Sequence, residues 1–245
     1  MTKVMLFAFA PMVAAILAAA IAALWKPSGR LRSAMQHLAA GVVFAAVALE
    51  MGPDLLKRHE SISTAVGFCI GVGLFVCLRY FTERDKDDNR DPAEESPKQS
   101  RVSSSYVATT GSDLLVDGLM IGIGFVAGAK AGVLLSIALT LELISLGLAL
   151  VGYMRERGKT ALTAVAITSA LTALVPLGTF IGMRALAHMP DAIINGTIAA
   201  GTAALLYLVT EELLRDAHKQ PEGPLTTAIF FAGFLVVLLL DMQMK

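Results

Sequence analysis

The sequence predicts an all-α integral membrane protein, with eight transmembrane helices in a bundle of three, two and three. Of its 245 residues, 56% are hydrophobic, and the mean hydropathy of +0.68 exceeds that of an ordinary soluble domain. Eight apolar runs are each long enough to cross about 30 Å of hydrocarbon. The connections between the runs are short, with one exception. We therefore treat residues 1–245 as a single transmembrane domain.

The eight predicted spans follow one another closely. They cover residues 4–25, 33–56, 62–82, 105–128, 131–152, 161–184, 191–214 and 225–243. The first resembles a signal peptide, because Lys3 precedes an alanine-rich stretch. Its apolar core, Val4 to Trp25, is longer than the apolar region of a typical signal peptide, so we expect it to remain as a span.

The long connection covers residues 83–104, ERDKDDNRDPAEESPKQSRVSS. It is polar, mixed in charge and poor in aromatic residues, which is typical of a disordered loop. A metal-gathering loop is the alternative, but the segment contains no histidine or cysteine. The composition therefore favours a solvated linker.

The basic residues predict the orientation. Most of the 20 lysine and arginine residues lie in or beside the connections after the first, third, fifth and seventh spans. Basic residues are enriched on the cytoplasmic side of membrane proteins. We therefore expect the 83–104 loop in the cytoplasm and both termini outside, with a bacterial inner membrane as the expected location.

Two spans resemble each other. One contains LAAGVVFAAVALEMGPDLLKRHE from Leu38, and the other contains IAAGTAALLYLVTEELLRDAHK from Ile198. In the orientation above they run in opposite directions, as in the inverted repeats of many secondary transporters. Chance likeness of two alanine-rich helices is the alternative. The repeat predicts one acidic cluster near each mouth, formed outside by Glu50 and Asp54 and inside by Glu211 and Glu212.

Three carboxylates lie deep in the fourth and fifth spans. Asp113 and Asp117 are four residues apart and share a helix face, and Glu142 lies near the middle of the next span. An ionised carboxylate in hydrocarbon costs several kcal/mol unless it faces water, takes up a proton or binds a cation. We interpret these three residues as a cation site near the midplane. Gly118 and Gly122 on the same span form a small-xxx-small pair, which favours close helix packing.

With these residues in hand, the chain resembles the ZIP family of divalent-metal transporters. The resemblance rests on DLLVDGLMIGIGFVAGAKAG, ELISLGLALVG, SALTALVPLGTFIG and the flanking AAG helices, and it covers most of the chain. It implies eight spans with both termini outside, a long cytoplasmic loop after the third span and a metal site on spans four and five.

The resemblance also implies site positions. The family's fourth span carries a His-Asn-x-Pro-Glu-Gly motif, whose members match Asp113, Leu114, Val116, Asp117 and Gly118 in order. The fifth span carries His-x-x-Pro-Glu-Gly, whose members match Glu142, Ser145, Leu146 and Gly147, with a register one residue away left open. Both motif histidines are thus acids here, and both prolines are absent.

The substitutions bear on the metal. Zinc favours imidazole and thiolate ligands, whereas an all-carboxylate set suits harder cations such as manganese. We expect a transported divalent ion, zinc, manganese or iron, and no prosthetic group. A metal sensor or a degenerate scaffold that does not transport is the alternative.

Other functions are disfavoured. An intramembrane aspartyl protease needs two aspartates on facing helices, whereas Asp113 and Asp117 share one helix. A serine enzyme needs a base near its nucleophile, and no histidine lies within these two spans. We therefore expect no enzyme. With zero formal net charge, nothing indicates nucleic acid. The expected partners are a divalent metal ion and the lipid bilayer, and a homodimer is kept open.

Overall fold

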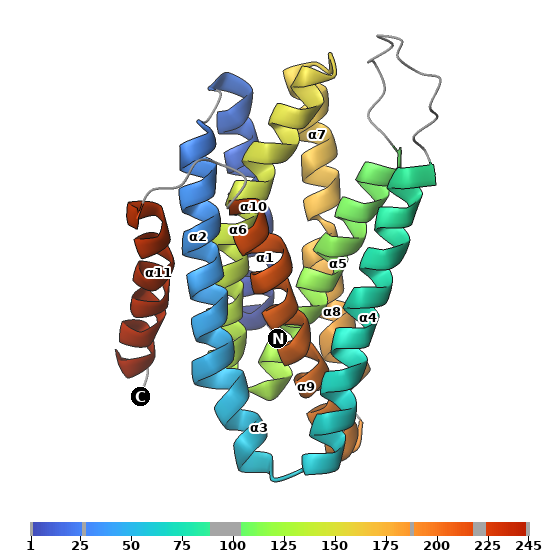
Figure 1. The fold of residues 1–245 in the computed structure, drawn as a ribbon, viewed down its shortest axis with the longest axis vertical. Helices are drawn as coiled ribbons and strands as arrows, with labels where there is room; N and C mark the ends of the chain where they lie inside the picture. The colour runs from blue at the N-terminus through green and yellow to red at the C-terminus, as the bar shows by residue number, and fades with distance from the viewer. Residues whose placement is uncertain (1, 26–27, 89–103, 187–188, 218–223, 244–245) are drawn as a thin grey trace.

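A computed structural model describes residues 2–25, 28–88, 104–186, 189–217 and 224–243, and all regular structure among them is helical (Figure 1). The elements are α1 (Thr2–Leu24), α2 (Gly29–Ala46), η1 (Val47–Met51), α3 (Gly52–Arg58), α4 (Ser61–Asp88), α5 (Ser104–Ala127), α6 (Ala129–Glu156), α7 (Ala161–Thr172), α8 (Leu174–Leu186), α9 (Asp191–Tyr207), η2 (Leu208–Leu213), α10 (Leu214–Ala217) and α11 (Pro224–Gln243). The helical prediction is therefore confirmed.

Elements such as α2, η1 and α3, or α7 and α8, continue one another as single long segments, and successive long segments run in alternate directions along the long axis (Figure 1). Six of them are long and apolar enough to cross a membrane: Val4–Leu24, Gly29–Arg58, Val107–Ala127, Ala129–Glu156, Ala161–Leu186 and Asp191–Glu211. Two more apolar helices, Ser61–Cys77 and Thr227–Gln243, are shorter within the described residues. The integral membrane class is confirmed, and the eight-span arrangement stays a prediction.

The predicted 83–104 loop falls only partly within the described residues. Helix α4 continues to Asp88 and α5 begins at Ser104, whereas residues 89–103 lie outside the described part of the chain. The linker interpretation therefore stays a prediction.

Glycines bring several helices into backbone contact. A Cβ on Gly118 of α5 would lie 2.1 Å from the Val175 carbonyl oxygen of α8, and a Cβ on Gly67 of α4 would lie 2.0 Å from the Gly196 carbonyl oxygen of α9. Gly41 approaches α11 in the same way. Only a residue without a side chain permits such contacts, so the packing expected from the small-xxx-small pair is observed for Gly118.

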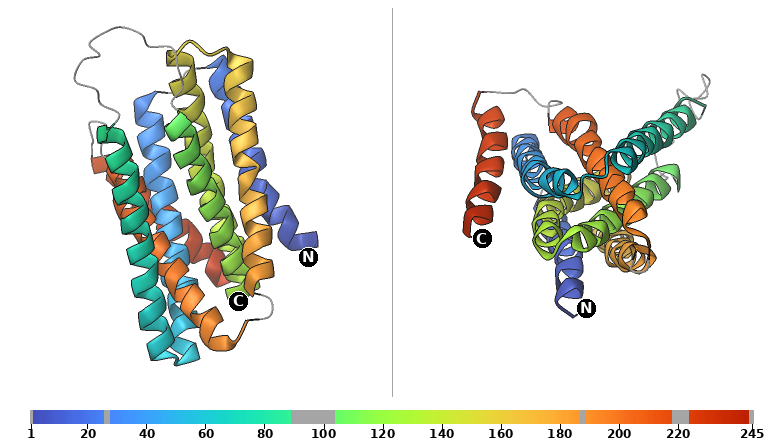
Figure 2. Two further views of the ribbon diagram at one scale, coloured as in Figure 1. Left: turned by 90° about the vertical axis from the view of Figure 1, so that its right-hand side faces the viewer. Right: turned by 90° about the horizontal axis from the view of Figure 1, so that it is seen from below.

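We group the helices by their four most extensive pairwise contacts into two bundles, which we call the first and second bundles. In the first bundle, α1 packs on α6, α5 packs on α8, and α7 joins them. In the second bundle, α11 packs on α2, and α4 packs on α9. The bundles meet where α2 lies against α6 and α9 lies against α5, and the view along the long axis displays this arrangement (Figure 2).

Two helices contain a π-helical turn. In the second span, η1 follows α2, and the Gly52 N–H donates to the Val47 carbonyl five residues earlier. In the seventh span, η2 follows α9, and the Leu214 N–H donates to Val209 in the same way. Pro53 lacks an N–H and so favours irregular hydrogen bonding in η1. Such turns are frequent at functional sites, and each contains an acidic residue, Glu50 or Glu211.

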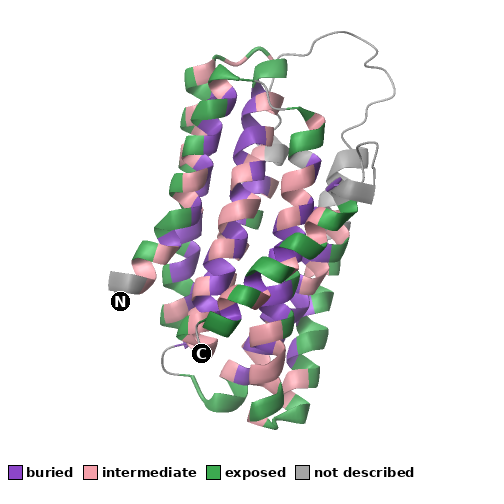
Figure 3. Cartoon of the chain, turned by 90° about the vertical axis from the view of Figure 1, so that its left-hand side faces the viewer, coloured by how far each residue is buried: buried purple, intermediate pink, exposed green. Residues whose placement is uncertain are grey.

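Burial follows the inner faces of the helices (Figure 3). Leu114, Leu139 and Leu143 are fully buried where α5 and α6 meet their neighbours. Large apolar residues such as Ile62 and Leu162 are exposed on the outside. A surface of this kind suits contact with lipid.

Candidate functional site

The three predicted midplane carboxylates lie within about one helical turn of one another along the α5–α6 hairpin, by residue count from the Gly124–Gly132 contact. The two helices run in opposite directions on either side of Gly128, and a Cβ on Gly124 of α5 would lie 3.3 Å from the Cα of Gly132 on α6. Counting back along α5 from Gly124 and forward along α6 from Gly132 by the same number of residues places Asp113 opposite Leu143, the neighbour of Glu142. The hairpin thus brings two distant parts of the sequence to the same depth.

The three carboxylates have different surroundings. Asp113 is exposed, Asp117 is 7% exposed, and Glu142 is half-buried with its Oε2 atom fully covered. Lysine and arginine are absent from the sequence of α5, and in α6 they occur only near the two ends. A carboxylate between apolar helices needs a polar partner, water, a proton or a cation.

The carboxylates are not gathered into a closed metal-binding cluster. Among the residues that the structure describes, no group of three or more histidine, cysteine, aspartate or glutamate side chains is arranged to hold a metal ion. A metal at this level therefore needs ligands other than three protein carboxylates, such as water or backbone carbonyl oxygens.

The regular helical hydrogen bonding is interrupted beside α5. The sixth predicted span is interrupted between α7 and α8 at Ala173, and Pro176 follows in the first turn of α8. Pro176 has no N–H, so it cannot donate the usual helical hydrogen bond to the Thr172 carbonyl. A Cβ on Gly111 of α5 would touch the side chains of Leu171 and Leu174, which lie on either side of the interruption. The interruption therefore lies beside α5 close to Asp113, two residues after Gly111. This interruption was not predicted, although Pro176 within an apolar run indicates one.

The predicted outer acids contact basic side chains. Glu50 Oε1 lies 3.0 Å from Lys130 Nζ at the start of α6. The same ammonium group contacts Asp241 Oδ1 near the end of α11. Asp54 Oδ2 accepts a 2.8 Å hydrogen bond from Arg58 Nε within α3. Asp241 and Lys130 were not predicted as site residues, because their partners are far away in the sequence.

The predicted inner acids lie in the π-helical turn η2. Glu211 is half-buried there, and the side chain of Glu212 lies outside the described residues. Glu211 is far from Asp113 along the sequence, yet α9 packs on α5, so both belong to adjoining helices. The role of this pair as an inner mouth stays a prediction.

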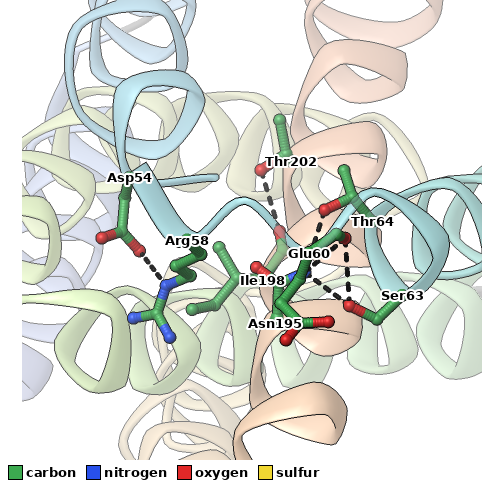
Figure 4. A network of polar contacts seen from close by, with 8 residues as sticks. All are labelled: Asp54, Arg58, Glu60, Ser63, Thr64, Asn195, Ile198 and Thr202. Atoms are coloured by element: carbon green, nitrogen blue, oxygen red, sulfur yellow. Dashed lines mark hydrogen bonds and ion pairs between the residues drawn. The ribbon is translucent and has the colours of Figure 1, made fainter. Parts of the chain in front are cut away.

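A buried amide fixes the start of α4 against α9 (Figure 4). Asn195 is 1% exposed, and its Nδ2 lies 2.7 Å from Ser63 Oγ, 2.9 Å from Thr64 Oγ1 and 3.3 Å from the Glu60 carbonyl oxygen. The Asn195 amide thus donates to two hydroxyl oxygens and one carbonyl oxygen at the start of α4. These contacts hold two helices of the second bundle together near the connection between α3 and α4.

Comparisons with known proteins identify the relationship. The sequence profile of the ZIP zinc transporter family matches residues 81–241, about two thirds of the chain. The chain belongs to the ZIP zinc transporter family. It is also 27% identical over 232 residues to the zinc transporter ZIPB of Bordetella bronchiseptica (strain ATCC BAA-588 / NCTC 13252 / RB50), an alignment that covers 87% of this chain and 72% of that protein.

Family membership confirms the resemblance and supports metal-ion transport by an integral membrane protein. The matched segment includes α5 and α6 with the three carboxylates and ends at Asp241. ZIP membership therefore concerns the part of the chain in which the candidate site lies.

Proposed function

We propose that this ZIP protein carries a divalent metal ion across the membrane toward the cytoplasm, by way of Asp113, Asp117 and Glu142. The observation that carries the proposal is that these three acids lie within about one helical turn of one another on two adjoining apolar helices, with no basic residue near them in either helix. Their mutual repulsion is relieved when a cation arrives, which gives the three acids an affinity for divalent ions.

Zinc is the first candidate metal because the relative from Bordetella bronchiseptica is a zinc transporter. Manganese is the second, because the acidic residues of α5 and α6 offer carboxylate oxygens rather than imidazole or thiolate. A metal ion with so few protein ligands keeps some of its bound water molecules. Partial hydration suits transport, because a carried ion must leave as well as bind.

Alternating access follows from the two bundles. In an inverted repeat, the first three spans correspond to the last three, and span four corresponds to span five. The contact of α1 with α6 then has its counterpart in that of α8 with α5, and the contact of α11 with α2 in that of α4 with α9. All four contacts are observed. The π-helical turns η1 and η2 begin six and seven residues after Gly41 and Gly201, the glycines of the two AAG segments. These correspondences support the repeat, and movement of one bundle against the other exposes the carboxylates to each side in turn.

The second candidate function is a metal sensor or scaffold without transport. The observation that favours it is the lack of a three-residue metal-binding group among the described residues. A sensor binds metal and carries no flux, so a single comparison of binding and flux separates the two functions.

The test is uptake of zinc and manganese into proteoliposomes that contain the purified full chain. The triple variant D113N/D117N/E142Q removes the three charges with little change in shape. The matched control D191N removes one exposed carboxylate from the start of α9. We expect saturable uptake by the wild type and D191N, and none by the triple variant.

Uptake that is equal in the wild type and the triple variant rejects the midplane site. A wild type that binds metal but carries none rejects transport and favours the sensor.

A further inference from the structure

Lys130, Glu50 and Asp241 join three helices near one end of the molecule. Lys130 Nζ lies 3.0 Å from Glu50 Oε1 and also contacts Asp241 Oδ1. The side chains of Lys130, Glu50 and Asp241 are 25%, 16% and 8% exposed. One ammonium group thus fills a largely covered position between two acids.

The helix positions of these residues are locally unfavourable. Lys130 lies in the first turn of α6, where the positive end of the helix dipole favours acids. Asp241 lies in the last turn of α11, where the dipole favours bases. Local helix stability therefore does not account for either residue. The contact between Lys130 and Asp241 explains why both residues stand at these positions.

The contact also connects the two bundles. Lys130 belongs to α6 of the first bundle, whereas Glu50 and Asp241 belong to the second bundle, on η1 and α11. Glu50 stands on a π-helical turn, a feature that is frequent at functional sites. A movement that parts the two bundles at this end of the molecule would break both contacts of the ammonium group.

We propose that Glu50 and Asp241 form a second cation site, which the Lys130 ammonium fills in this conformation and from which a divalent cation displaces it. Two carboxylates attract a doubly charged ion more strongly than they attract a singly charged ammonium group. Carboxylate oxygens also suit hard divalent ions. Displacement frees Lys130 and releases the connection between the bundles. The inference deepens the proposed transport function and rests on it for the class of cation.

The test measures how exposed the Lys130 amine is. The full chain in detergent is treated with an acetylating reagent, with and without Mn²⁺ at matched ionic strength, and acetylation of each lysine is quantified by mass spectrometry. Lys57, an exposed lysine of α3, is the internal control. We expect Mn²⁺ to raise Lys130 acetylation several-fold and to leave Lys57 unchanged. No change at Lys130, or protection by Mn²⁺, overturns the inference.

The variant E50Q/D241N tests the site itself. Its Lys130 should be acetylated rapidly without metal, with no further increase when Mn²⁺ is added. A Mn²⁺ effect that persists in this variant overturns the site. Since the wild type carries the main measurement, a variant that fails to fold leaves the inference testable.

The midplane variant D113N/D117N/E142Q separates this inference from the proposed function. A Mn²⁺ effect on Lys130 that persists in this variant supports a distinct site at Glu50 and Asp241. If the effect disappears there, metal at the midplane releases Lys130, so the distinct site is overturned while the proposed function stands. Conversely, a wild type that shows the Mn²⁺ effect but no flux retains the site and loses transport.

A substitution of Lys130 provides an independent measurement. K130Q leaves two carboxylates without their ammonium group, so Mn²⁺ should raise its melting temperature more than that of the wild type. K57Q removes an exposed positive charge from α3 and should respond to Mn²⁺ as the wild type does. Equal Mn²⁺ shifts in K130Q and the wild type contradict the inference.

Discussion

Gly118 lies where α5 and α8 touch backbone to backbone, and replacing it by alanine tests the packing of the first bundle. The added Cβ would lie 2.1 Å from the Val175 carbonyl oxygen and 3.0 Å from the Gly178 Cα. Ordinary carbon-to-oxygen contacts between helices are about 3.3 to 3.6 Å long. The variant G118A therefore has to move α8 away by about 1 Å. The atom that obstructs the methyl group belongs to backbone, so no side-chain rotation relieves the contact.

The free energies can be compared directly. Overpacking of this kind costs about 1–3 kcal/mol, whereas alanine gains at most about 1 kcal/mol over glycine in helix propensity. We expect G118A to lose about 1–2 kcal/mol of the free energy of unfolding, measured by thermal or denaturant unfolding in detergent. The matched control is G73A in α4, where a Cβ meets no atom within 4 Å. We expect G73A to be neutral or more stable.

Two results would refute this reasoning. If G118A is as stable as the wild type, α5 and α8 do not pack as closely as the structure has them. If G73A loses as much stability as G118A, the loss comes from replacing a helical glycine in general and not from contact with Val175.

Two further predictions concern the second bundle and the outer acids. N195A should lose about 1–2 kcal/mol and speed hydrogen exchange at the start of α4, because Ser63 and Thr64 lose a buried partner; the control T197A removes only a hydrogen bond within α9, and equal losses in the two variants would contradict the prediction. R58Q should raise metal uptake into proteoliposomes at low ionic strength, because it unmasks the Asp54 charge. That gain should vanish in D54N/R58Q and at about 1 M salt, where the Debye length is about 3 Å; a gain that survives high salt would exclude electrostatic attraction.

The spans could be predicted from the sequence because hydropathy is a local property. Apolar runs set the helices, and the flanking glycines and polar residues set their ends within a few residues, as for α6 and α9. The three carboxylates of spans four and five could be predicted for the same reason, since each lies inside its own apolar run. Their similar depth was also predicted from the sequence, because each lies near the middle of its apolar run; their surroundings depend on the packing of α5 on α6.

The contacts of Lys130 could not be predicted, because they depend on tertiary structure. Lys130 and Asp241 lie more than a hundred residues apart, and each looks like an isolated charge near a span end in the sequence. The π-helical turns were also missed, since a single added residue in a helix changes hydropathy very little. Asp54 was expected to collect cations, but it pairs with Arg58 four residues later in the same helix. That spacing was visible in the sequence and was not used in the prediction.

The two π-helical turns give their helices a means of rotation. A π turn holds one residue more than an α turn of the same length, and each residue of an α-helix accounts for about 100° of rotation. If η1 or η2 reverts to α geometry, the segment that follows it turns by about 100° about its own axis while the preceding segment stays in place. For η1 that segment is α3, and for η2 it is α10. Glu50 and Glu211 thus lie at points of helix rotation, where an acid can face a different neighbour while the helix stays intact.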